Sequence, residues 1–400
     1  MPEIISSEWE RSRGSVFRPS LKSFSSRAPE RGPRLLFFSG GTALKDTAHE
    51  LVAYTHNSIH LITPFDSGGS SATLRKAFGM PAVGDVRARI MALADHNRLG
   101  HSEIYTLFAY RLPADSPERL LRKELASLAN GRHPLLRQIP DPMKNIIREH
   151  ICCFVRAMPS DFPLTGANIG NLVLTAGYLM HDRRLRPIIA LYSRMLRAHG
   201  FVRPIVEKPA HLAVRLANGE VIIGQHRFTG KGSICIASPI VDIWLTRSED
   251  SVEPADVEIP RYTADIIGKA DAVCYPVGSF YSSVVANLLP KGVGRAIAAN
   301  SCQKIFVPNL GRDPELAGHT VKMQIVKLLS LLQSDAPDAE PRDFLNKVLV
   351  DADRGEYPGS LPHKWLERQG IELVSKQLIR TGKGPLADAR LLAAALNSLV

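Results

Sequence analysis

The chain has 400 residues, of which 44% are hydrophobic and 22% are charged, a balance typical of a folded globular protein. Its formal charge of +11 favours anionic partners and suits a small phosphorylated ligand. No apolar stretch reaches the roughly 18 residues that a membrane-spanning helix needs, and the N-terminus lacks the apolar segment of a secretory signal. The five cysteines are scattered without metal or disulfide spacing, which predicts reduced thiols, a cytoplasmic location and no membrane partner.

The first folded segments predict a parallel βαβ unit. Residues 1–33, rich in Ser, Arg and Pro, precede it and predict a flexible basic tail. Apolar residues 35–38 and 59–63 predict two buried strands, each ending in a glycine-containing turn, and residues 44–54 predict a helix between them. Such connections are right-handed and place both turns on one edge of the sheet, where open α/β sheets bind ligands.

The rest of the chain predicts a helical insertion and more strands. Residues 100–200 are mostly helical in pattern, and Asn218-Gly219 between two apolar runs predicts a β-hairpin. Strands are expected at 211–216, 221–223, 234–237, 272–275, 304–307, 347–350 and 371–374, and a long helix at 315–333. We predict an α/β fold with a Rossmann-like, mostly parallel sheet, a helical insertion and a β-hairpin. Its core covers residues 34–333, with a C-terminal α/β extension at 334–400 packed on it.

The turn after the first strand is the first candidate site. Its glycines, Gly40 and Gly41, let backbone N–H groups approach an anion, and the following helix N-terminus favours negative charge. Thr42 adds a hydroxyl donor. A purely structural tight turn is the alternative, because two glycines after a strand are common.

The turn after the second strand is the second candidate. It contains Asp66, Ser67, Gly68, Gly69, Ser70 and Ser71, with Arg75 one helical turn later. Asp66 is able to bind Mg²⁺ or a ribose hydroxyl, the Gly and Ser donors to hold a phosphate, and Arg75 to add positive charge. The alternative is an aspartate N-cap followed by capping serines.

Further polar residues stand at later turns and helix starts. They are Asp85 and Arg87, Asn168 and Asn171 before an apolar helix, Gly278, Ser279, Tyr281 and Ser282 after the strand at 272–275, and Asn309 after the strand at 304–307. Local ion pairing, helix capping and a packed tyrosine are the structural alternatives. Strand-ending turns in one parallel sheet converge on one crevice, which predicts a nucleoside-diphosphate site. The chain contains no nucleophile elbow, Walker A loop, HExxH helix or GxGxxG fingerprint.

The order of these motifs resembles the CofD-like family over about residues 34–330. The matching motifs are Gly-Gly-Thr at 40–42, Asp-Ser-Gly-Gly-Ser-Ser at 66–71, Gly-Asp-Val-Arg at 84–87, Gly-Asn-Leu at 170–172, Gly-Ser-Phe-Tyr-Ser-Ser at 278–283, Asn-Leu-Leu at 287–289 and Val-Pro-Asn-Leu at 307–310. The family includes 2-phospho-L-lactate transferase and the YvcK-type gluconeogenesis factors. The most similar subgroup is the CofD-like protein of the bacterial GAK system, which accompanies ATP-grasp and kinase-like proteins.

The resemblance implies a Rossmann-like core and one of two ligand classes. The transferase moves 2-phospholactate from a guanosine-diphosphate-type donor to a deazaflavin with magnesium, whereas the YvcK-type proteins bind a UDP-sugar and act as regulators. The loop pattern is closer to the second class. Departures from the family pattern are Ala43 for a glycine, Ser67 for an acid, Val277 within the Gly-Pro-Gly-Ser turn and Ala88 for an asparagine. These changes leave a phosphate site and disfavour deazaflavin transfer.

We therefore expect a nucleotide-binding protein for a GDP- or UDP-linked ligand, transferase-like or sugar-nucleotide-sensing, with Asp66 as the Mg²⁺ ligand. A 2-phospho-L-lactate transferase-type phosphotransferase is the alternative, and a nucleic-acid-binding protein driven by charge is a third hypothesis, disfavoured because no readout motif is present. The sequence identifies no nucleophile, so whether the chain is an enzyme stays open. We expect no tightly bound organic cofactor, a homodimer, and ATP-grasp or kinase-like partner proteins.

Overall fold

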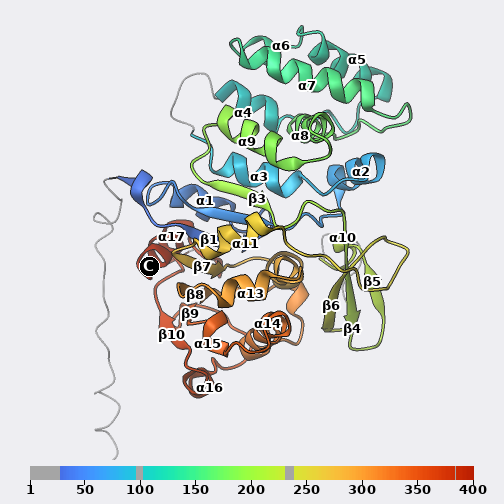
Figure 1. Ribbon diagram of the computed structural model, residues 1–400. Helices are drawn as coiled ribbons and strands as arrows, with labels where there is room; N and C mark the ends of the chain where they lie inside the picture. Colours follow the sequence, from blue (N-terminus) through green and yellow to red (C-terminus); the bar gives the residue numbers. More distant parts are fainter. Residues whose placement is uncertain (1–27, 96–101, 230–237, 383) are drawn as a thin grey trace, which may run out of the picture.

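The computed structural model describes residues 28–95, 102–229, 238–382 and 384–400, and Figure 1 shows its layers. A seven-stranded parallel sheet has the order β10-β9-β8-β7-β1-β2-β3, and a three-stranded antiparallel sheet has the order β5-β4-β6. The strands are β1 (Leu35–Ser39), β2 (Ile59–Ile62), β3 (Phe201–Pro204), β4 (His211–Leu216), β5 (Val221–Ile223), β6 (Ile240–Thr246), β7 (Ala272–Tyr275), β8 (Gln303–Phe306), β9 (Lys347–Val350) and β10 (Glu372–Ser375). The expected α/β, Rossmann-like fold is confirmed.

The central strand β1 determines where a ligand can bind. The chain continues from β1 to β2 and β3 on one side, whereas β7, β8, β9 and β10 follow on the other side. The strand order therefore reverses between β1 and β7, and this switch point is where open α/β sheets form a crevice. All five residues of β1 are buried, since helices cover both faces of the sheet.

Helices surround the large sheet on both faces (Figure 1). They are α1 (Lys45–Leu51), α2 (Gly69–Phe78), α3 (Gly84–Ala92), α4 (Ser102–Ala109), α5 (Glu118–Ala129), α6 (Pro134–Arg137), α7 (Met143–Ala157), α8 (Ile169–Met180), α9 (Leu185–Met195), α10 (Gln225–Phe228), α11 (Arg261–Gly268), α12 (Ala286–Leu288), α13 (Val293–Ala298), α14 (Val321–Asp335), α15 (Pro341–Phe344), α16 (His363–Arg368) and α17 (Ala389–Asn397). Leu36 and Phe38 of β1 face the core formed with α11, α13 and α14, and Phe37 faces the core formed with α1 and α17. Among the described helices, none is long and apolar enough to cross a membrane.

The helices between β2 and β3 have a core of their own. Buried residues of α3 to α9 form one apolar cluster, which reaches the sheet through Ile62 of β2 and Val202 of β3. In Figure 1 the helices α4 to α9 stand together at the top, on the side of β3. The predicted insertion at 100–200 corresponds to this layer.

Several element boundaries differ from those expected. The helix expected at 315–333 begins at Val321, because Gly318 has a positive φ of 76° and the Thr320 side chain caps the helix by accepting from the Met323 N–H. The strands β3 and β6 were not predicted, and the strand expected at 234–237 lies outside the described residues. Residues 28–33, expected in the tail, bond to the body, where the Asn57 amide donates to Gly32 O at 2.8 Å.

Gly177 on α8 provides a test of packing in the helical layer. A β-carbon at Gly177 would lie 2.2 Å from the Ile188 side chain of α9, so Gly177→Ala should lower the free energy of unfolding by about 1–3 kcal/mol. Gly268→Ala at the end of α11 is the control, since nothing lies within 4 Å of its β-carbon position. Urea denaturation measures both variants. A Gly177→Ala protein as stable as the control would show that the two helices separate at no cost.

Candidate functional site

The turn after β1 is in contact with two other segments at the carboxyl edge of the sheet. A β-carbon at Gly40 would lie 2.5 Å from Ser283 Oγ, and one at Gly41 would lie 2.2 Å from Asp85 Oδ1. Only glycine fits at these distances. The start of α3 and the segment after β7 therefore meet the first turn, while Thr42 is exposed to solvent.

The turn after β2 brings a second carboxylate beside the start of α3. Asp66 Oδ1 accepts a hydrogen bond from the Gly68 N–H at 3.0 Å. Its Oδ2 lies 3.8 Å from the place where a β-carbon of Gly84 would be, and Ser71 Oγ lies 2.7 Å from that place. The Asp66 carboxylate therefore lies beside the start of α3, the helix that carries Asp85.

Two asparagines of α8 connect this crevice to the helical layer. The Asn168 side chain caps α8 by accepting from the Asn171 N–H at 3.0 Å, so the capping role belongs to Asn168. Asn171 Nδ2 donates to Ser70 Oγ at 2.9 Å, and its Oδ1 accepts from Arg87 Nε at 2.9 Å. Asn171 therefore joins the second turn to α3.

Arg75 forms hydrogen bonds with backbone carbonyls of the second turn. Its buried guanidinium donates to the carbonyls of Phe65 and Asp66 at 3.1 Å each, and to Ala210 O at 2.5 Å. Burial lowers the pKa of Arg75, and the charges of Glu249 and Asp66 act in the opposite direction. The structure thus uses this cation to hold the turn against the segment after β3.

Ser67, at the position where the family carries a second acid, contacts a histidine that the sequence analysis did not select. The His226 N–H donates to Ser67 Oγ at 3.2 Å, and Ser67 Oγ lies 2.8 Å from His226 Nδ1. The tautomer of the ring decides which of the two groups donates in the second contact. No local pattern reveals this pair, because 159 positions separate its members.

The segment after β7 has its amides occupied by carboxylates of the chain itself. The Phe280 N–H donates to Asp313 Oδ2, and the N–H groups of Tyr281 and Ser282 donate to Glu315 Oε2, each at 2.9 Å. Burial, followed by the charge of Asp313, raises the pKa of Glu315 to about 7. A ligand phosphate would have to displace these carboxylates to use the same amides.

Other expected residues of this segment also have internal partners. Asn309 Oδ1 accepts from the Gly278 N–H at 2.8 Å, and Asn309 Nδ2 donates to Gly278 O at 2.8 Å. The Tyr281 ring is buried, with its hydroxyl 2.9 Å from His319 Nε2, so it packs in the core in this structure. Ser279 remains partly exposed next to these groups.

Arg89 on α3 is the main site residue that the sequence analysis missed. It is fully buried and donates to Leu44 O at 2.7 Å and to Gly40 O at 2.9 Å, at the two ends of the first turn. Burial lowers the pKa of Arg89 to about 10, against an opposing effect of the Asp85 charge, so the side chain stays charged at neutral pH. An arginine within a helix carries no sequence signal for this role.

The crevice is suited to a ligand that combines phosphate and hydroxyl groups. Ser283 and Asp85 lie against the first turn, Ser71 and Asp66 lie near the start of α3, and Thr42 is exposed. Within the described ranges, no cluster of three or more His, Cys, Asp or Glu residues is placed to hold a metal ion. A metal would therefore have Asp66 as its carboxylate ligand and would need ligand oxygens to complete its shell.

The fold defines a Rossmann-like protein, and its candidate site lies at the switch point of a parallel sheet. Residues 35–379 match the family described as "2-phospho-L-lactate transferase CofD", and the chain belongs to this family. The family resemblance inferred from the motifs is thus confirmed.

Relatives of known name extend the comparison. The "Gluconeogenesis factor" of Bacillus subtilis is 22% identical over 361 residues, covering 87% of this chain and 91% of that protein. A relative from Nostoc sp. is 29% identical over 294 residues, and the match spans 50% of its length. A crystal structure of a Bacillus halodurans protein superposes with a TM-score of 0.66 at 20% identity, covering 92% of this chain and 99% of that one, and it supports the fold.

Replacement of Arg89 tests how the first turn is held. Arg89→Met removes the donors to Gly40 O and Leu44 O from a fully buried place, so the free energy of unfolding should fall by about 1.5–3 kcal/mol. Arg89→Lys keeps the charge with fewer donors and should fall between Arg89→Met and the wild type. Chemical denaturation gives the values. A more stable Arg89→Met protein would mean that the cost of burying the charge exceeds the gain from its hydrogen bonds.

Proposed function

We propose that this protein binds a nucleoside-diphosphate-linked ligand, of the UDP-sugar or GDP-linked kind, in the crevice at the carboxyl ends of β1, β2 and β7. The observation that carries the proposal is the close approach of Gly41 to Asp85 and of Gly40 to Ser283 at the switch point of the sheet. Polar side chains of α3 and of the segment after β7 thus gather around a glycine turn, with Thr42 exposed beside it, at the place where parallel α/β sheets bind nucleotides.

The roles of the side chains follow from their chemistry. Amides of residues 40–42 and the Thr42 hydroxyl would donate to the diphosphate oxygens. The Asp66 and Asp85 carboxylates would accept from ribose or sugar hydroxyls. Ser283 beside Gly40 would add a further donor on the β7 side. The amides occupied by Asp313 and Glu315 have no role in this proposal.

Magnesium fits the same crevice. The family resemblance implies Mg²⁺, and Asp66 would be its carboxylate ligand, which suits an ion that is bound through one or two carboxylates and substrate phosphates. When bound, Mg²⁺ would neutralise charge on the diphosphate. Ser67 contacts His226 and supplies no second acid.

A transferase of the 2-phospho-L-lactate transferase type is the second candidate. It is favoured by the family resemblance and by Asp85, a second acid that lies against the first turn. The sensing function is favoured instead by the resemblance of the loop pattern to the YvcK-type proteins, and the relatives named gluconeogenesis factors are consistent with that subgroup. Both functions need the same nucleotide crevice and differ in whether a metal ion is required.

Gly41→Val tests the crevice itself. The branched side chain would meet Asp85, and binding of a UDP-sugar and of GDP should be lost while the fold is kept, because the turn lies at the end of its strand. Calorimetric titration measures binding, and thermal unfolding monitors the fold. Gly268→Val, at an exposed helix end remote from the switch point, is the matched control. Wild-type affinity in Gly41→Val would refute the site.

Asp66→Asn separates the two candidate functions. Amide binding of a diphosphate needs no metal, so ligand binding should persist in EDTA, and Asp66→Asn should weaken it by about 1.5–3 kcal/mol, the value of one hydrogen bond to a charged group. Titrations with Mg²⁺ and then with EDTA measure this, and Asp46→Asn on the exposed face of α1 is the charge-matched control. If EDTA abolished binding and Asp66→Asn reproduced that loss, the metal-dependent transferase would replace the sensor.

A further inference from the structure

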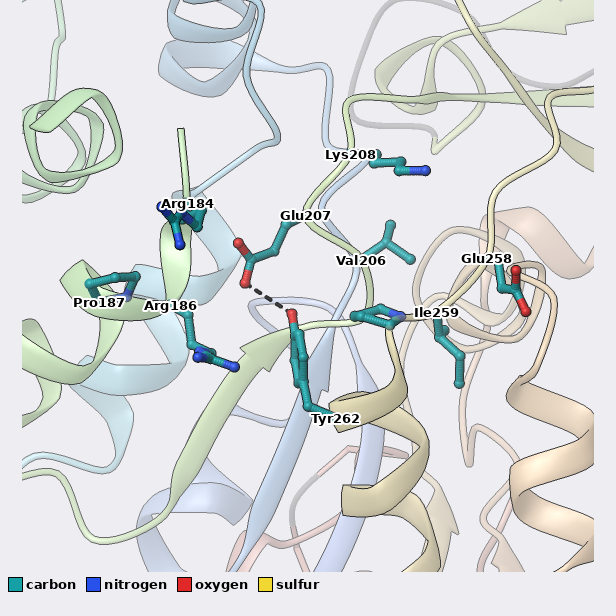
Figure 2. Close-up of a pocket in the computed structure, with 10 residues that line it drawn as sticks. Arg184, Arg186, Pro187, Val206, Glu207, Lys208, Glu258, Ile259 and Tyr262 are labelled. Carbon is teal, nitrogen blue, oxygen red and sulfur yellow. Dashed lines mark hydrogen bonds between the residues drawn. The ribbon is translucent and has the colours of Figure 1, made fainter. Parts of the chain in front are cut away.

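A second cavity opens at the carboxyl end of β3, the edge strand of the large sheet. It has a volume of about 510 Å³, which is the size of a small-molecule site, and lies among the starts of α9 and α11 and the residues that follow β3. Figure 2 shows its lining, which includes Arg184, Arg186, Val206, Glu207, Lys208 and Tyr262. None of the residues assigned to the nucleotide crevice lines it.

The cavity contains cations without acidic partners. Arg186 and Lys208 form no ion pair with any residue that the structure describes. Arg186 instead lies over the Tyr262 ring, 5.2 Å from its centroid, in a cation–π contact that positions the guanidinium and leaves its charge uncompensated. Arg184 pairs with Asp182 at 3.0 Å, but both side chains are well exposed, and such pairs are weak and easily exchanged.

The two acidic residues of the lining, Glu207 and Glu258, interact with groups other than Arg184, Arg186 and Lys208. Glu207 Oε2 accepts from the Leu185 N–H at 3.0 Å, at the start of α9, and Oε1 accepts from the Tyr262 hydroxyl at 2.9 Å. Glu258 pairs with Arg295 at 3.6 Å and lies on the opposite side of the cavity from Arg184 and Arg186 (Figure 2). Glu207 lies beside Arg184 and Arg186 in Figure 2, but both of its oxygens already accept hydrogen bonds, so neither arginine is paired with it.

A buried cation stands next to the cavity. Arg203 of β3 is 9% exposed, stacks on Phe201 at 4.1 Å, and its Nε has no hydrogen-bond partner among the described residues. Burial lowers the pKa of Arg203, and the charges that act on it besides are those of Tyr262, Glu207 and Arg186, all from the cavity wall. An anion in the cavity would offset this buried charge.

We propose that this cavity is a second ligand site, which binds a small phosphorylated or carboxylated molecule. Its anionic group would contact Arg184, Arg186 and Lys208, and its body would lie against Tyr262 and Val206. Because β3 is next to β2 and two strands from β1, the site is roughly 5–10 Å from the nucleotide crevice along the same edge of the sheet, a distance that suits an acceptor or an effector of the nucleotide ligand. The proposal stands independently of the nucleotide site.

The test uses calorimetric titration of the full chain with inorganic phosphate, glucose 6-phosphate, citrate and glucose. Wild type should bind the anions and not glucose, with glucose 6-phosphate tighter than phosphate if the apolar wall contributes and citrate tighter if the natural ligand is a carboxylate. The double variant Arg186→Gln/Lys208→Gln should lose at least tenfold in affinity. Its control is Lys364→Gln/Arg368→Gln on α16, an exposed pair that packs beside β10 at the opposite edge of the sheet and removes the same charge.

Three outcomes would overturn the proposal. If no anion binds wild type, the site does not exist. If both double variants lose affinity equally, the effect is one of net charge. If Gly41→Val, which blocks the nucleotide crevice, abolishes anion binding, the anion is bound in that crevice. Retained anion binding in Gly41→Val would support the second site, whether or not that variant still binds nucleotides. Lys208→Gln alone, an exposed substitution, should lower affinity severalfold, and its unfolding temperature verifies the fold.

Discussion

The crevice depends on one close approach, in which the backbone after β1 lies so near two polar side chains that no β-carbon fits. Asp85 from α3 and Ser283 from the segment after β7 make this approach, at 2.2 and 2.5 Å from the missing β-carbons of Gly41 and Gly40. The buried Arg89 side chain completes the arrangement by donating hydrogen bonds to Gly40 O and Leu44 O, at the two ends of the turn. Three segments that are distant in sequence must therefore fold together before the turn has its shape. An anion at such a turn would be bound by backbone N–H groups, without a cationic side chain.

Charged side chains around the crevice mainly satisfy backbone groups. Loops at the edge of a sheet leave amides and carbonyls without ladder partners, and burying such groups unpaired is costly. Asp313 and Glu315 accept from the amides after β7, whereas Arg75 and Arg89 donate to carbonyls of the first two turns. Asp66 also accepts from a backbone amide, that of Gly68, so the carboxylates at this edge of the sheet have internal roles too.

This use of charge also explains part of the basic composition. Arg75, Arg89 and Arg203 are buried, so their charges belong to the interior and not to a polyanion-binding surface. Arg186 and Lys208 have no such internal task and stand together at a cavity. The net charge of +11 therefore includes cations with structural tasks as well as the pair at the end of β3. A small anion matches that pair, since it is confined to one cavity.

The sequence alone was sufficient for the parallel sheet and for the turns at 40–42 and 66–71, because buried strands appear as continuous apolar runs and strand-ending glycines follow them directly. It also predicted the hairpin at Asn218-Gly219 and the family. It did not reveal β3, where Arg203 and Pro204 interrupt the apolar pattern and the pairing with β2 makes the strand. Only the tertiary structure decided that Asn168 caps α8 while Asn171 joins Ser70 to Arg87, that Ser67 meets His226, and that Glu315 occupies the amides of Tyr281 and Ser282. These pairings depend on distances between segments far apart in the chain, and local residue patterns contain no information about such distances.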